Sequence, residues 1–230
     1  MKALVFCAHA DDEVIAVGGT LRKLADAGAT IRLVMFSEGA EGYARVEDKD
    51  RIVQVRHEET LKVCQILGIT EYFNLHLLDW DLKVGNETYR AVVGHIRQFQ
   101  PDIVLTHTRA DYNDHIAVHD VATEGWFHAA LPCAMEQGPV WRLVPLYEFE
   151  VLQPMASPTL VVDVTDTFQA KVEAMKVYES QHSHVGSVFQ LMEGRALERG
   201  CLIGVKYGEA LKLSHYRPRP ILDVSQLAEF

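Results

Sequence analysis

The chain has 230 residues, of which 48% are apolar and 23% are charged, and its formal net charge is −10. These values are ordinary for a soluble globular protein, and the length suits a single domain, 1–230, with a substantial core. The acidic balance, with no basic stripe to neutralise phosphates, argues against nucleic acid as a partner but leaves a small phosphorylated ligand open.

The cysteines and the amino terminus indicate a reduced, cytoplasmic setting. The four cysteines are far apart and form no Cys-x-x-Cys pair: Cys7, Cys64, Cys133 and Cys201. The first polar motif begins at residue 9, too early for a signal peptide, and no apolar run predicts a transmembrane segment. A homo-oligomer is compatible with the sequence.

Strand and helix signals alternate along the chain. The first apolar run, 3–7, predicts a buried strand, and the helix that follows from about residue 12 ends before Gly28. Further strands are expected at 31–36, 72–77, 103–106, 146–152 and 160–164. Further helices are expected at 50–67, 88–99, 115–130, 165–180 and 186–199, whereas 40–50 has the composition of a loop and 205–213 gives no clear signal. This order predicts a parallel sheet with helices on both faces and no domain boundary.

The motif AHADDE, residues 8–13, ends the first strand and begins the first helix. Carboxylates are favourable there because free backbone N–H groups and the positive end of the helix dipole are near. Helix capping explains one aspartate but not a histidine, two aspartates and a glutamate in a row. The motif therefore predicts a functional site.

A second polar cluster follows the predicted strand 103–106, in the sequence THTRADYNDH of residues 106–115. In a doubly wound sheet of order 3-2-1-4-5-6, strands one and four are neighbours at the reversal of strand order, where ligands bind beyond the carboxyl ends. The two clusters are therefore expected to meet at one crevice.

Three residues of these clusters, His9, Asp12 and His115, supply two nitrogens and one carboxylate, the pattern of a catalytic zinc (Zn²⁺) site with an open position for water. Such a metal lowers the pKa of its water towards about 7. Adjacent side chains diverge, so Asp11 is free to act as general base. Asp114, next to His115, is a candidate for orienting that ligand. The Gly18-Gly19 pair lacks the spacing of a dinucleotide fingerprint and indicates close helix packing instead.

These residues carry a resemblance to a known family. AHADDE at 8–13 with GGTL at 18–21 resembles the AHPDDE…GGTL signature of the PIG-L/LmbE-like zinc-dependent de-N-acetylases. The segments RHEE at 56–59, DYNDH at 111–115 and the block from 162 to 181 resemble later motifs of that family. The likeness runs from residue 1 to about residue 210.

The resemblance implies a Rossmann-like three-layer α/β/α sandwich with a mainly parallel sheet. It also implies one zinc ion and hydrolysis of an N-acetyl group from an N-acetylglucosamine-type sugar conjugate, giving acetate and a free amine. By position His9, Asp12 and His115 are its ligands and Asp11 its general base. Arg56, Tyr112 and Asp114 are expected to contact the substrate.

Two positions depart from the family pattern. Ala10 replaces a proline, and Tyr112 replaces a histidine that is often assigned a proton-donating or oxyanion-stabilising role. His107, directly after the strand 103–106, is our predicted catalytic substitute for that histidine. His182 and His184 are the alternatives.

Two other functions stay open on the sequence. Asp-Asp-Glu could bind metal in a phosphoesterase, and the missing histidine is compatible with a non-catalytic sugar-binding module. The group attached to the sugar cannot be read from the residues.

Overall fold

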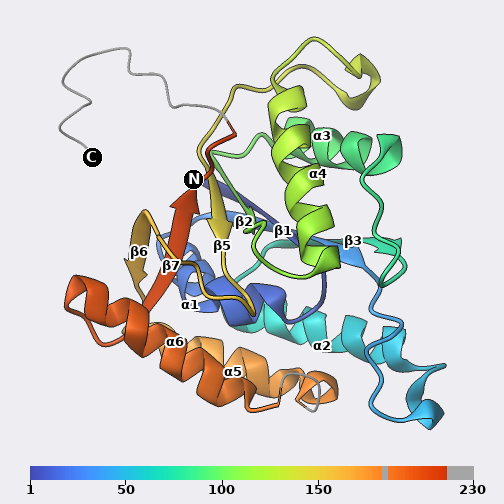
Figure 1. Cartoon of the computed structure of the whole chain (residues 1–230). Coiled ribbons are helices and arrows are strands. Elements are labelled where there is room, and N and C mark those ends of the chain that lie inside the picture. The colour runs from blue at the N-terminus through green and yellow to red at the C-terminus, as the bar shows by residue number, and fades with distance from the viewer. Residues whose placement is uncertain (183–185, 217–230) are drawn as a thin grey trace.

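The strands of the chain form one seven-stranded sheet in the computed structural model, which describes residues 1–182 and 186–216 (Figure 1). The strands are β1 (Lys2–Cys7), β2 (Thr30–Ser37), β3 (Glu71–Leu77), β4 (Ile103–His107), β5 (Leu146–Phe149), β6 (Leu160–Asp163) and β7 (Gly208–Leu213). The helices are α1 (Asp12–Asp26), α2 (Ile52–Leu67), α3 (Asn86–Phe99), α4 (Asn113–Ala129), α5 (Phe168–Val177) and α6 (Val188–Ile203). Single 3-10 turns lie at Val46–Asp48, Met135–Gln137 and Glu179–Gln181.

The strand order is β3-β2-β1-β4-β5-β7-β6. The first five strands are parallel and lie as predicted, so β1 and β4 are neighbours. β7 departs from the predicted order because it enters between β5 and β6 and is antiparallel to both. Its sequence GEALKL carries Glu209 and Lys212 within six residues. These charged residues interrupt the apolar alternation, so the sequence did not predict a strand here.

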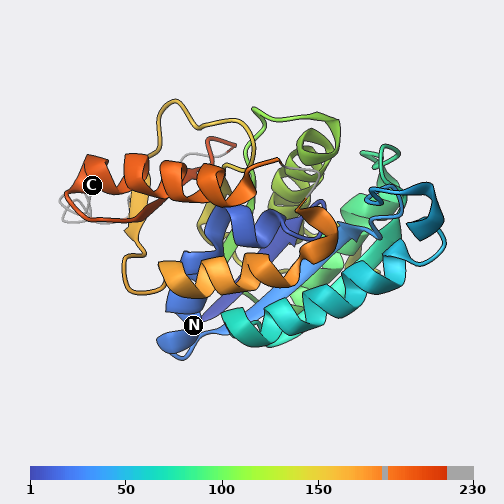
Figure 2. The same cartoon turned by 90° about the horizontal axis from the view of Figure 1, so that it is seen from below.

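Two hydrophobic cores flank the sheet, which makes the fold a three-layer sandwich. Alternate side chains of β1 point to opposite faces: Ala3, Val5 and Cys7 pack in one core and Leu4 and Phe6 in the other. Helices α3 and α4 cover the second core, while α1, α2, α5 and α6 cover the first (Figures 1 and 2). The predicted fold class is confirmed.

Helix α1 is kinked at Val17, whose φ is −132°. Beyond the kink, the backbone N–H groups of Gly19 and Thr20 donate to the Glu209 carboxylate at 2.9 and 2.7 Å. Lys171 of α5 donates to the same carboxylate at 2.6 Å, and both charged side chains are buried. A Cβ atom on Gly19 would lie 2.8 Å from Val164 Cβ, so the predicted close packing at the glycine pair is confirmed.

The four cysteines are free, and Cys7 and Cys64 are buried. Within 1–182 and 186–216, no helix combines the length and apolarity that crossing a bilayer would require.

Candidate active site

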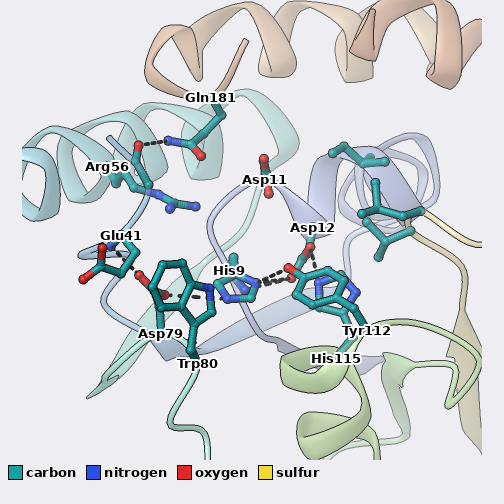
Figure 3. Close-up of a pocket in the computed structure, with 14 residues that line it drawn as sticks. His9, Asp11, Asp12, Glu41, Arg56, Asp79, Trp80, Tyr112, His115 and Gln181 are labelled. Atoms are coloured by element: carbon teal, nitrogen blue, oxygen red, sulfur yellow. Dashed lines mark hydrogen bonds and ion pairs between the residues drawn. The ribbon is translucent and has the colours of Figure 1, made fainter. Parts of the chain in front are cut away.

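A pocket of about 270 Å³ lies beyond the carboxyl ends of β1 and β4, near the lower end of the range for small-molecule sites. The strands pair through Ala3 with Ile103 and Val5 with Leu105, so the loops that follow them meet. The pocket is lined by His9, Asp11, Asp12, Ile15, Glu41, Gly42, Arg56, Asp79, Trp80, Tyr112, His115, Val151, Leu152 and Gln181 (Figure 3).

The turn between β1 and α1 holds Asp11 in an unusual backbone conformation, with φ at 111°. Such a φ is strained for any residue with a Cβ atom. Glu13 stabilises the turn because its carboxylate accepts the backbone N–H of Asp11 at 3.2 Å. The Tyr178 hydroxyl donates to the other Glu13 oxygen at 2.6 Å. Burial raises the pKa of Glu13 to about 7 although this hydroxyl lowers it.

His9, Asp12 and His115 come together at the base of the pocket. One ligand atom from each lies within 4.8 Å of the others. Asp12 is the centre of this group, with Oδ1 3.2 Å from His115 Nε2 and Oδ2 3.9 Å from His9 Nδ1. His115 is 1% exposed, and its ring nitrogens lie within ion-pair distance of Asp12 and Asp111 without making a well-aligned hydrogen bond among the described residues. A buried donor set whose imidazole nitrogens lack such a bond fits a metal cation.

Carboxylates orient both histidines of this group. Asp114 Oδ2 lies 3.0 Å from His9 Nε2, on the side away from Asp12. Asp111 Oδ2 lies 3.3 Å from His115 Nδ1. The carboxylate that orients His115 is therefore Asp111, just before α4, and not the predicted Asp114, which faces His9 instead. Such pairs fix the ring orientation of metal-binding histidines.

The electrostatics of the group favour a positive charge. Burial lowers the pKa of His115, but Asp12 and Asp111 outweigh it and raise this pKa to about 10. Burial likewise opposes ionisation of Asp12, but His115 and His107 hold its pKa well below the usual range. A metal cation would supply the positive charge that these carboxylates stabilise.

A second group, His9, Asp79 and Asp114, also has ligand atoms within 4.8 Å of one another. Its carboxylates are already engaged. Asp114 Oδ2 accepts the backbone N–H of Trp80 at 3.0 Å as well as facing His9, and Asp79 accepts the N–H of Glu41 at 2.6 Å. The group with Asp12 is therefore the better metal site.

Asp11 lies in the pocket wall beside this group, facing Arg56. Burial and the neighbouring charge of Asp12 raise the pKa of Asp11 well above its usual range, although Arg56 lowers it. Arg56 is 4% exposed and donates to the Ala10 carbonyl at 2.8 Å. Gly42 makes room for this side chain, since a Cβ atom there would lie 2.1 Å from Arg56 Nη1.

Tyr112 forms another wall of the pocket and is 43% exposed. Its hydroxyl lies 3.0 Å from His9 Nδ1, and its ring packs against His115 with a centroid separation of 4.1 Å. Burial and the surrounding carboxylates raise the pKa of Tyr112.

His107 does not reach the pocket. It is 1% exposed, and its Nε2 accepts the backbone N–H of Ala8 at 3.0 Å. Its ring stacks on His115 and meets the edge of Phe149, and burial lowers its pKa to about 4. A neutral imidazole with its acceptor nitrogen occupied is poorly suited to the predicted proton-donating role. The geometry indicates instead that His107 supports His115.

Other predicted residues also lie outside the pocket. Asp114 is 3% exposed and sits behind His9 rather than in the pocket lining, because its Oδ2 contacts both His9 and the Trp80 backbone. His182 contacts the Met175 carbonyl and Phe189, and His184 lies outside the described residues.

Four further residues line the pocket and had no predicted role: Glu41, Asp79, Trp80 and Gln181. Asp79 and Trp80 follow β3 after one residue, Leu78, and the carboxyl end of a parallel strand is a signal that could have identified them. Gln181 donates to the Gly42 carbonyl at 3.2 Å.

The sequence profile of the PIG-L family, described as GlcNAc-PI de-N-acetylase, matches residues 4–126. This segment covers more than half of the chain and includes His9, Asp12 and His115. The chain belongs to the PIG-L family. The resemblance seen in the sequence is confirmed.

Curated relatives include two kinds of enzyme. The diacetylchitobiose deacetylase of Thermococcus kodakarensis is 27% identical, over 92% of this chain and 82% of that protein. The 4-oxalmesaconate hydratase of Pseudomonas putida is 28% identical, over 86% of this chain and 80% of that protein. Among solved structures, the N,N'-diacetylchitobiose deacetylase of Pyrococcus horikoshii has a TM-score of 0.86 at 24% identity, covering 97% of this chain and 88% of that one.

Proposed function

We propose that this member of the PIG-L family is a zinc-dependent N-deacetylase that acts on an N-acetylglucosamine-type sugar or conjugate and releases acetate and a free amine. The observation that carries the proposal is the His9, Asp12 and His115 group with Asp11 beside it in one pocket. The deacetylase names among the relatives support the substrate class. One domain spanning 1–230 would carry the activity.

His9, Asp12 and His115 would hold the metal, since they present two imidazoles and a carboxylate, a set that zinc accepts. Zinc in such a site is a Lewis acid that polarises an amide carbonyl and lowers the pKa of water. Asp111 and Asp114 keep the two imidazoles turned towards Asp12.

Asp11 would move the proton. Its carboxylate takes a proton from the attacking water as the water oxygen bonds to the carbonyl carbon. It then returns this proton to the nitrogen as the carbon–nitrogen bond breaks, so the products are acetate and the amine. The strained turn and the Glu13 contact hold this carboxylate on the pocket side of α1.

Tyr112 and Arg56 would bind the reacting group. The Tyr112 hydroxyl is a hydrogen-bond donor at neutral pH and lies in the pocket wall next to His9, where it can donate to the oxyanion of the tetrahedral intermediate. Arg56 presents a buried guanidinium on the side of Asp11 that is opposite to Tyr112. It would contact the sugar.

The hydratase among the relatives makes water addition to an unsaturated acid the second candidate. The substrate in the name of that hydratase, 4-oxalmesaconate, is a carboxylate anion. The pocket of this chain is lined by the carboxylates of Asp11, Asp12, Glu41 and Asp79 against the guanidinium of Arg56. This charge balance favours a neutral N-acetylated sugar over a polyanion.

The test is acetate release from a panel of N-acetylglucosamine conjugates by protein of measured zinc content. We expect acetate from at least one conjugate, loss of release in Asp11→Asn, and no hydration of 4-oxalmesaconate. Phosphate release from phosphorylated sugars without acetate would identify a phosphoesterase. Tight zinc and sugar binding without any turnover would identify a binding module.

A further inference from the structure

Trp80 stands exposed at the mouth of the pocket. Its side chain is 78% exposed and belongs to the pocket lining. Figure 3 shows it beside His9, on the side opposite to Tyr112. The other tryptophans behave differently, since the indole N–H of Trp126 donates to the Val144 carbonyl and that of Trp141 to the Pro101 carbonyl.

The backbone of Trp80 is held in a defined conformation. Trp80 has a φ of 65°, in the left-handed region that is uncommon for a large side chain. Its N–H donates at 3.0 Å to Asp114 Oδ2, the same oxygen that faces His9 Nε2 at 3.0 Å. The residue before it, Asp79, accepts the N–H of Glu41 at 2.6 Å. The Trp80 backbone is therefore linked through Asp114 to a histidine of the metal group, which fixes where the ring leaves the chain.

An indole left in water forgoes the free energy that its burial would release, about 25 cal/mol per Å² of apolar surface. A ligand can supply that burial when its apolar face covers the ring. Pyranose rings present such faces of C–H groups, and aromatic side chains are the usual surfaces that receive them. His9, Asp12 and His115 lie at the base of the pocket, where the N-acetyl group would be cleaved. The Trp80 indole at the pocket mouth would therefore contact the group linked to that sugar.

The charge around Trp80 restricts that linked group. Glu41 and Asp79 line the pocket on the Trp80 side, as Figure 3 shows, and the described lining contributes Arg56 as its one guanidinium, next to Asp11. A phosphate or carboxylate near Trp80 would face these two carboxylates without a cationic partner. A neutral ring would avoid repulsion by these carboxylates and could cover the apolar face of the indole.

We propose that Trp80 is a stacking platform for a second, uncharged ring, and that the substrates are neutral glycosides of N-acetylglucosamine rather than the free monosaccharide or phosphorylated forms. This inference rests on the proposed deacetylation for its kinetic test. The binding of the second ring can be measured without turnover.

The kinetic test compares N,N'-diacetylchitobiose, N-acetylglucosamine and N-acetylglucosamine 1-phosphate as substrates. In the wild type, kcat/KM is expected to be highest for the disaccharide. Trp80→Ala should lower kcat/KM for the disaccharide about tenfold and leave the monosaccharide within about twofold, the scale of one aromatic contact. Trp80→Phe should restore most of the loss. Leu78→Ala is the matched control, because Leu78 is 58% exposed on the same loop but does not line the pocket.

The binding test uses the tryptophan fluorescence of Asp11→Asn protein titrated with N,N'-diacetylchitobiose. A saturable change that disappears in the Asp11→Asn, Trp80→Phe double variant supports the platform. If the wild type releases no acetate but this fluorescence signal saturates, the proposed deacetylation is wrong and the stacking role of Trp80 is retained.

An equal loss of kcat/KM on disaccharide and monosaccharide in Trp80→Ala, or a preference for the 1-phosphate, overturns the inference. A changed molecular mass in size exclusion with unchanged kinetics would also overturn it, because Trp80 would then contact a second copy of the chain.

Discussion

The backbone N–H of Ala8 donates a hydrogen bond to Nε2 of His107 at 3.0 Å, and this bond joins the end of β1 to the end of β4. Both strands carry residues of the metal group just beyond this point. The imidazole also stacks on His115 with a centroid separation of 4.1 Å. His107 therefore connects the two halves of the site from behind.

His107→Leu should destabilise the fold and leave the acid–base behaviour of turnover unchanged. The substitution leaves a buried N–H without an acceptor, which costs about 1–3 kcal/mol of unfolding free energy. Denaturant unfolding measures this loss. His107→Gln, which keeps an acceptor, is the milder control. If the pH profile of kcat in His107→Gln lost its acidic or basic limb, His107 would be the proton donor predicted from the sequence.

His115→Ala should lose bound zinc. The wild type should hold about one zinc per chain, because a three-ligand site binds one catalytic metal. His119→Ala is the matched control: His119 lies one turn further along α4 and contacts Asp120 and Glu148 instead of the metal group. Elemental analysis of chelator-free protein measures the ratio, and full zinc retention in His115→Ala would remove His115 from the site.

Asp11→Asn should keep zinc and lose turnover. An amide of the same shape preserves the pocket but cannot accept a proton, and loss of a general base lowers kcat by about 10²–10⁴-fold. Asp12→Ala should instead weaken zinc binding, because Asp12 is the carboxylate between the two histidines. Metal-free Asp11→Asn together with zinc-loaded Asp12→Ala would show that the two roles are reversed.

Glu209→Gln should be strongly destabilising although it lies outside the pocket. The carboxylate neutralises Lys171 and accepts the N–H groups of Gly19 and Thr20. Removing one partner of a buried ion pair costs about 3–5 kcal/mol. The double variant Glu209→Gln, Lys171→Met should recover part of this loss in denaturant unfolding. Equal stability of Glu209→Gln and wild type would contradict a structural role for the pair.

His95 should make the protein less stable as the pH falls below about 6.5. Burial lowers the pKa of His95 to about 4, so the folded state binds this proton less readily than the unfolded state. The stabilising contribution is full above the unfolded pKa and is lost as the pH falls towards 4. At pH 5 the loss is on the order of 1–2 kcal/mol. His95→Phe, which can still pack against Phe73, should unfold with a smaller difference between pH 7 and pH 5.

The parallel part of the fold and the metal group were predictable for the same reason. The alternation of strands and helices dictates which strand ends are adjacent, and this rule alone brought His9 and His115 together. The identity of the proton donor was not predictable in this way. His107 contacts Asp12, with its Nε2 3.3 Å from Asp12 Oδ2, and stacks on His115, but it does not line the pocket itself. These tertiary contacts leave no signal in the sequence.

The end of β3 could have placed Asp79 and Trp80 near the site, but their positions at the pocket mouth depend on the paths of loops. Asp79 and Trp80 reach the site through hydrogen bonds to Glu41 and Asp114, residues that are 38 and 34 positions away in sequence. Neither bond leaves a periodic signal.

β7 was missed for a different reason, since the Glu209 that interrupts its apolar pattern has its partners in α1 and α5.

The left-handed backbone of Asp11 lowers the stability of the fold at the residue that we propose as the general base. Glycine adopts a φ of 111° without the steric cost that a Cβ atom brings, about 1–2 kcal/mol. Comparing the unfolding free energies of Asp11→Gly and Asp11→Asn would separate relief of the backbone from loss of the charge. Under the proposed mechanism, Asp11→Gly is expected to be more stable than the wild type and to lack turnover, so selection for thermal stability alone would favour loss of the activity with the fold retained.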